Sequence, residues 1–177
     1  NDHVNMGQSS NDTFPTAMCI AGVYQVSTNL LPALDRLRAS MSDLGSKWDS
    51  IVKIGRTHLM DATPIRIGQV FTGFSSQVSK AISRCENARM ILLGNMPIGG
   101  TAVGTGINAH PEFADRVCAA LSPAPSAGIY TREPKLDFTE AVDHVEAQAT
   151  KDSFVDAHAQ FKTIAVSLSK IANDIRH

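Results

Sequence analysis

A run of apolar residues at steps of four and three, between residues 67 and 92, constrains this fold more than any other feature. The stripe comprises Ile67, Phe71, Phe74, Val78, Ala81, Cys85, Ala88 and Leu92. Such spacing places every member on one face of a helix, as in the seam of a coiled coil or a long bundle helix. We predict that this helix starts with Thr63 as its N-cap and Pro64 at its first position, and that Gly94 and Pro97 end it.

Two further long helices are predicted from their apolar periodicity, over residues 13–48 and 141–175. Pro32 lies inside the first of them, where it removes one backbone hydrogen bond and clashes with the preceding turn. We therefore expect a bend near Leu31. A shorter helix is predicted to start at Glu112, after His110 and Pro111.

These elements predict an all-α fold built from long, nearly antiparallel helices. The low aromatic content of 6% also suits close-packed helices better than a β-sandwich. A helix of about 30 residues spans about 45 Å, which exceeds the diameter of a compact domain of this size. We therefore expect apolar stripes to stay exposed on the single chain and to be covered by oligomerisation. The Pro- and Gly-containing segment 122–134 is predicted to be a loop.

Composition and charge exclude several classes of partner. Sixteen basic and seventeen acidic residues leave a net charge of -1, so no global positive field favours nucleic acid or an anionic membrane surface. No apolar run approaches the roughly 20 residues of a membrane span. Cys19, Cys85 and Cys118 are too few and too far apart for a disulfide framework, which predicts reduced, packed thiols and a cytoplasmic location.

Two segments are polar where the helical pattern does not require it. The first, residues 7–12, precedes a helix, where hydroxyl, amide and backbone N–H groups can converge on an anion. Taken alone, these residues are those that helix capping predicts, and capping is the favoured interpretation. The second, residues 55–64, holds Thr57 and His58 in a predicted loop. Capping explains Thr63 in that segment but does not explain His58.

Several blocks in order resemble class II fumarase, a member of the fumarase/aspartase superfamily, over nearly the whole chain. The blocks are Asn1-Asp2-His3-Val4-Asn5, Gln8-Ser9-Ser10-Asn11-Asp12, Lys53-Ile54-Gly55-Arg56-Thr57-His58-Leu59, Asp61-Ala62-Thr63-Pro64, Gly99-Gly100-Thr101-Ala102-Val103-Gly104-Thr105-Gly106 and Lys170-Ile171-Ala172-Asn173-Asp174-Ile175-Arg176. The resemblance implies that residues 1–177 are the central helical-bundle domain of that family. It also implies that the N- and C-terminal domains of the family lie outside these residues.

The resemblance implies reversible hydration of fumarate to L-malate, without metal or organic cofactor, in a homotetramer whose active sites are shared between subunits. Removing the proton next to a carboxylate builds an aci-carboxylate dianion, so such a site must offer hydrogen-bond donors. Ser9, Ser10, Asn11 and Thr57 match the family's substrate-binding positions. His58 matches its catalytic histidine, which exchanges a proton with the incoming or departing water.

Two parts of the family's machinery extend beyond this chain. Asn1 and Asp2 match a secondary carboxylate site that also needs a preceding segment. The family's Gly-Ser-Ser loop, which supplies the serine that takes the carbon-bound proton, is expected beyond His177. The resemblance therefore implies that residues 1–177 hold only half of the catalytic groups.

Alternative functions differ at a few positions. Aspartase-type ammonia lyases tend to carry Ser-Thr-Asn where this chain has Ser9-Ser10-Asn11, and Gln where it has His58. A non-catalytic helical oligomerisation fragment is the other alternative, because the helical seams favour neither role. Residues 104–109 nearly fit a dinucleotide fingerprint, but no β-strand is predicted before them. His110 and His144 lack metal-ligand spacing, so we predict surface or capping roles for both and no metal site.

Overall fold

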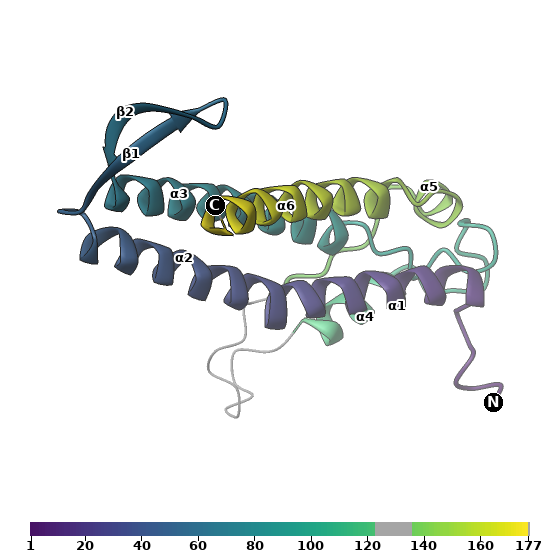
Figure 1. Cartoon of the computed structure of the whole chain (residues 1–177). Coiled ribbons are helices and arrows are strands. Elements are labelled where there is room, and N and C mark those ends of the chain that lie inside the picture. Colours follow the sequence, from purple (N-terminus) through teal and green to yellow (C-terminus); the bar gives the residue numbers. More distant parts are fainter. Residues whose placement is uncertain (123–135, 177) are drawn as a thin grey trace, which may run out of the picture.

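The computed structural model describes residues 1–122 and 136–176, so nearly all of the predicted loop at 122–134 lies outside the described residues. The elements are α1 (Ser10–Gln25), the π-helix η1 (Val26–Leu30), α2 (Leu31–Lys47), β1 (Val52–Thr57), β2 (Met60–Arg66), α3 (Ile67–Leu93), α4 (Phe113–Leu121), α5 (His144–Ala149) and α6 (Asp152–Arg176). α1, η1 and α2 form one long helical rod, and α3 runs back along it (Figure 1). α6 lies beside α3, while the β1–β2 hairpin projects near one end of the bundle (Figure 1). The helical fold class is confirmed, with one hairpin added.

The start predicted for the helix that carries the 67–92 stripe was wrong. α3 begins at Ile67, and Pro64 instead pairs with Ile54 in the antiparallel hairpin. The first N–H groups of α3 bond to carbonyls outside the helix. The N–H of Ile67 donates to the carbonyl of Ile51 (2.8 Å), and the N–H of Gly68 donates to the carbonyl of Trp48 (3.2 Å). Thr63 and Pro64 satisfy a local capping rule, but in the structure this segment pairs with the adjacent strand β1, which provides backbone hydrogen bonds along it.

The irregularity expected around Pro32 is present as the π-helix η1. The N–H of Leu31 donates to the carbonyl of Val26, five residues earlier. Because Pro32 has no N–H to donate, the helix absorbs the lost α-type hydrogen bond by one wide turn just before it. The helix also starts earlier than predicted, since Ser9 rather than Thr13 is the N-cap of α1.

The helix expected over residues 141–175 is divided into α5 and α6. The backbone of Thr150 is extended at the end of α5. The ammonium of Lys151 donates to the carbonyls of Gln148 (2.9 Å) and Thr150 (2.8 Å), so the carbonyls at this break are satisfied without a continuous helix. The short helix after Pro111 was predicted to within one residue, because Glu112 is the N-cap of α4.

The expectation that the stripe of α3 would lack an internal partner was wrong. Most of the stripe is buried inside the single chain: Phe74, Val78, Ala81, Cys85, Ala88 and Leu92. α1, η1 and α2 pack along one side of α3, and α6 packs along another. The error came from assuming a compact shape, because an elongated bundle gives a long helix partners of similar length. Other apolar side chains do remain exposed, namely Phe14, Tyr24, Met90, Val155, Val166 and Ile175.

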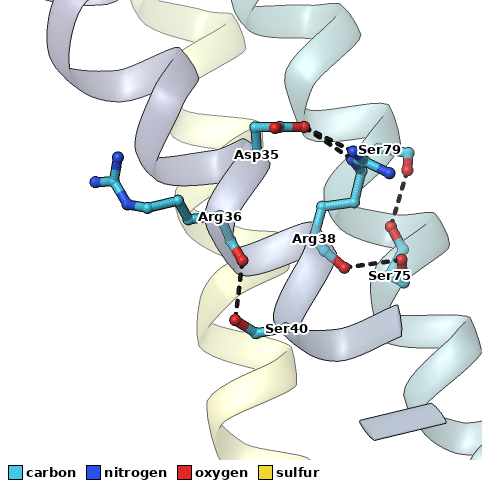
Figure 2. Close-up of polar contacts among 6 residues, drawn as sticks. All are labelled: Asp35, Arg36, Arg38, Ser40, Ser75 and Ser79. Atoms are coloured by element: carbon cyan, nitrogen blue, oxygen red, sulfur yellow. Dashed lines mark hydrogen bonds and ion pairs between the residues drawn. The ribbon is translucent and has the colours of Figure 1, made fainter. Parts of the chain in front are cut away.

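A polar seam joins α2 to α3 beside this core (Figure 2). The hydroxyl of Ser75 donates to the carbonyl of Arg38 (3.2 Å), and the hydroxyl of Ser79 donates to the carbonyl of Ser75 (3.0 Å). The Arg38 guanidinium pairs with Asp35 one turn earlier (2.8 Å). Because both charged side chains are largely exposed, this ion pair adds little stability, and the seam serves mainly to orient the two helices.

The three cysteines are free and buried, which confirms the prediction of packed thiols. Burial raises the pKa of each thiol, Cys19, Cys85 and Cys118, to about 11. The thiols therefore stay protonated near neutral pH and behave as small apolar side chains.

The helical rod Ser10–Lys47 is long and apolar enough, by length and composition alone, to cross a membrane. This contrasts with the expectation, from the apolar runs, of no membrane-spanning stretch. The finding is weak grounds for a span, because a core helix of a soluble protein passes the same test. In this structure Val23, Leu34 and Met41 of the rod are buried within the bundle.

The ends of α2 and α3 cross at a glycine that has no room for a side chain. A Cβ atom on Gly68 would lie 2.5 Å from both the Asp49 Cα and the Gly45 carbonyl oxygen. We expect Gly68→Ala to lower the free energy of unfolding by about 1 to 3 kcal/mol. The new methyl group would overlap the backbone of Gly45 and Asp49, so the backbone itself would have to shift to make room. Urea denaturation followed by circular dichroism measures the change.

Gly73 provides the matched control on the same helix, since a Cβ atom there would meet nothing within 4 Å. Gly73→Ala should raise the free energy of unfolding by about 0.5 to 1 kcal/mol, through helix propensity alone. Equal effects of the two substitutions would contradict a close crossing at Gly68.

Candidate functional site

Ser9, Ser10 and Asn11 lie together at the start of α1. The Ser9 hydroxyl accepts from the N–H of Asn11 (3.2 Å), so the capping interpretation is confirmed for Ser9. Ser10 and Asn11 are exposed. The Asn11 amide Nδ2 donates to the carbonyl of Ala102 (2.9 Å), which ties this segment to the glycine-rich residues 99–106. Hydroxyl and amide groups are thus presented to solvent from a segment fixed at both ends.

Asp12, the next residue, is a site residue whose position sequence reasoning missed. Its side chain is fully buried and accepts three backbone hydrogen bonds, from Ser9 (2.8 Å), Gly99 (3.2 Å) and Thr101 (2.8 Å). Gly99 and Thr101 both have positive φ, of 96° and 58°. Such turns direct successive N–H groups into one concavity that suits an anion. In this structure the N–H groups of Gly99 and Thr101 are occupied by the Asp12 side chain of the same chain.

A pocket of about 290 Å³ lies on this same segment. Its lining includes Gly104, Thr105, His110, Glu140 and His144. The His144 Nε2 donates to the carbonyl of Ile98 (3.0 Å) and lies 3.6 Å from a Glu140 carboxylate oxygen. His144 therefore ties two chain segments together, which corrects the surface or capping role predicted for it.

The capping role predicted for His110 is confirmed, because its Nδ1 accepts from the N–H of Glu112 at the start of α4 (3.2 Å). Within residues 1–122 and 136–176, no group of three or more His, Cys, Asp or Glu side chains could hold a metal ion.

Thr57 and His58 lie at the tip of the β1–β2 hairpin, which corrects the loop predicted for this segment. Thr57 pairs with Met60, leaving His58 and Leu59 as a two-residue turn. Both turn residues have positive φ, of 52° and 63°, as a type I′ turn requires. Non-glycine residues pay a steric cost in this conformation, which is typical of functional positions. The His58 side chain is exposed at the end of a projecting arm.

The structure does not bring the two predicted halves of the site together. Ser10 lies at the end of the bundle where the N-terminus is marked, whereas β1 and β2 project near the other end (Figure 1). Ser10–Lys47 comprises 38 helical residues, a length of about 57 Å at 1.5 Å per residue. Within one chain, a small substrate could not touch Asn11 and His58 at once.

Asn1 and Asp2 are exposed and precede α1, at the same end of the bundle as Ser10. The carbonyl of Asn1 accepts from the N–H of Asn5 (3.0 Å), so the segment is folded as a turn. Their assignment to a secondary carboxylate site stays a prediction.

The arrangement of segments on this bundle is one that a known family shares. A protein-family model described as lyase matches residues 1–177, the whole chain. The chain belongs to this lyase family.

Similar lyases have names that agree with the resemblance described above. Fumarate hydratase class II of Nitrosomonas europaea is 49% identical over 99% of this chain and 36% of its own length. The mitochondrial fumarate hydratase of Rhizopus oryzae is 45% identical over 100% of this chain and 34% of its own. The crystal structure of recombinant class II fumarase from Schistosoma mansoni superposes with a TM-score of 0.91 at 33% identity, covering 98% of this chain and 37% of that one. This lyase chain spans about a third of the length of these relatives.

Proposed function

We propose that this chain is the central helical part of a fumarate hydratase, which catalyses the reversible hydration of fumarate to L-malate. The observation that carries the proposal is the identity of 45 to 49% to fumarate hydratases along the whole chain. Ser10 and His58 support it independently, because ammonia lyases of the superfamily tend to carry other residues at these two positions.

The exposed polar groups suit the chemistry of this reaction. An aci-carboxylate intermediate develops negative charge on the substrate carboxylate, which hydrogen-bond donors stabilise when they are fixed in advance. Ser10, Asn11 and Thr57 supply such donors, and Ser9 holds their helix start in place. In this proposal His58 exchanges a proton with the water that adds to or leaves the substrate.

The distance between the two halves supports a homotetramer with shared active sites. The 38-residue rod Ser10–Lys47 separates the start of α1 from the base of the β1–β2 hairpin, so in this proposal a complete site takes Asn11 and His58 from different chains. The hairpin is suited to contact a neighbouring subunit, because its apolar side chains Ile54, Leu59 and Met60 are exposed and would be buried by that contact. In the proposed tetramer, His58 of one subunit approaches Ser10 and Asn11 of another.

The remaining catalytic groups, including a Gly-Ser-Ser loop, belong to other domains of the complete protein in this proposal. Buried, protonated thiols are compatible with a reducing compartment, and we propose the cytoplasm.

The function is tested on the complete protein by ultraviolet absorbance. Adding L-malate should produce the absorbance of fumarate, whereas L-aspartate should produce none. Absorbance that rises only with L-aspartate would replace the proposal by an ammonia lyase. No rise with either substrate, from a tetramer that is folded by circular dichroism, would favour a non-catalytic helical oligomerisation role.

A further inference from the structure

The buried Asp12 carboxylate joins two segments that are far apart in the sequence. It accepts from the N–H of Ser9 on its own side and from the N–H groups of Gly99 and Thr101 on the other. Hydrogen bonds that a carboxylate accepts are stronger than those between neutral groups. The start of α1 and the glycine-rich segment are therefore held together through one side chain.

Gln148 of α5 holds the same segment from a second side. Its amide Nε2 donates to the carbonyl of Thr101 (2.7 Å), and its Oε1 lies against the position that a Cβ atom on Gly100 would occupy. Thr101 is buried, so its backbone N–H and carbonyl are both engaged, by Asp12 and Gln148 respectively. The turn has little freedom to shift.

The turn that these two residues hold also supports Asn11. The Asn11 Nδ2 donates to the carbonyl of Ala102, which directly follows Thr101. Asn11 is thus connected to Asp12 both through the chain and through the turn. A displacement of Thr101 would therefore move the Ala102 carbonyl that accepts the hydrogen bond from the Asn11 amide.

We propose that Asp12 is a positioning residue that orients Ser10 and Asn11 for the substrate carboxylate, with Gln148 as its support. The inference rests on the proposed function, because it assigns substrate binding to Ser10 and Asn11. Asp12 is fully buried, so it acts through its neighbours and not on the substrate itself. It sets affinity for the substrate, while proton transfer at His58 is left unaltered.

Asp12→Asn in the complete protein tests the proposal, because the amide keeps the shape but replaces one acceptor oxygen by a donor facing backbone N–H groups. We expect the KM for L-malate to rise by about tenfold or more while kcat falls less than about threefold, the pattern of lost binding rather than lost chemistry. A merely structural role would lower the active fraction and hence kcat, with KM unchanged. Asp35→Asn is the matched control, since that carboxylate is exposed on α2 and should leave both constants unaltered.

Two further variants decide the matter if Asp12→Asn fails to fold or to assemble. Gln148→Ala loosens the same turn without altering a charge, and we expect the KM to rise by about threefold with kcat maintained. In an Asn11→Ala background, either change should raise the KM by less than about twofold, because residues that act as a unit are non-additive.

Opposite results would overturn the inference. An unchanged KM in folded, tetrameric Asp12→Asn or, where that variant does not fold, in Gln148→Ala would remove the positioning role. Effects that multiply fully with Asn11→Ala would do the same. Parent protein that lacks activity with L-malate would instead refute the proposed function, so the two failures are distinguishable.

Discussion

His58→Asn should lower the turnover number for L-malate by about 10² to 10⁴, the usual range for a lost general acid or base. Asparagine is similar in size and still forms hydrogen bonds, but it cannot exchange a proton near neutral pH. The side chain is exposed at the hairpin tip, so the bundle should fold as before. Steady-state kinetics on the complete protein measure the change, and light scattering should report the same assembly as for the parent.

His158→Asn is the matched control for this prediction. His158 is exposed on α6, far along the chain from the hairpin, and the chemical change is the same. It should leave the turnover number within about twofold of the parent, as surface changes usually do. Activity of His58→Asn within that same margin would remove His58 from the mechanism and leave it a structural role in the turn.

Mixing two impaired variants should restore activity at L-malate concentrations below the KM of the binding variant. One variant carries His58→Asn, and the other carries Ser10→Ala with Asn11→Ala. If each site takes residues 10 and 11 from one chain and residue 58 from another, random reassembly leaves both intact in about a quarter of the sites. Subunits are dissociated, mixed in equal amounts and reassembled, and activity with L-malate is compared with that of each variant alone.

A control mixture isolates the cause of any recovery. Chains carrying Ser10→Ala are mixed with chains carrying Asn11→Ala. In the proposed tetramer each site takes both of these residues from the same subunit. Every reassembled site then has one defect, so activity should not exceed that of the better variant. Failure of the first mixture to recover, with hybrid tetramers present by native mass spectrometry, would contradict shared sites.

Local rules were sufficient for the helices. Steps of three and four placed Val78, Ala81 and Cys85 on one buried face, because helical period depends only on sequence spacing. Pro32 indicated where the long helix departs from regular α-helical hydrogen bonding. The prediction was possible because proline lacks a backbone N–H in any structural context. Ser9 was one of several polar residues that suit an N-cap, and the structure selects it.

The hairpin at residues 52–66 was missed because strand pairing depends on residues outside the local helix-start motif. Thr63 and Pro64 present a good helix start, and nothing nearby along the chain opposes it. Only the pairing of Ile54 with Pro64, and the carbonyls of Trp48 and Ile51 that close the first turn of α3, move the start to Ile67. Sequence reasoning therefore identified Thr57 and His58 as unusual polar residues but not the arm that presents them.

The helical class, the family resemblance and the residue types of the candidate site could be predicted from the chain, because periodicity and motif order depend on sequence spacing alone. The positions of those residues in space required the folded structure. It buried Asp12 against the N–H groups of Gly99 and Thr101, more than 80 residues away along the chain. It also placed the start of α1 and the base of the β1–β2 hairpin near opposite ends of the bundle, because the rod Ser10–Lys47 lies between them. Rigid helices fix such separations, and no local pattern encodes which distant segments they bring into contact.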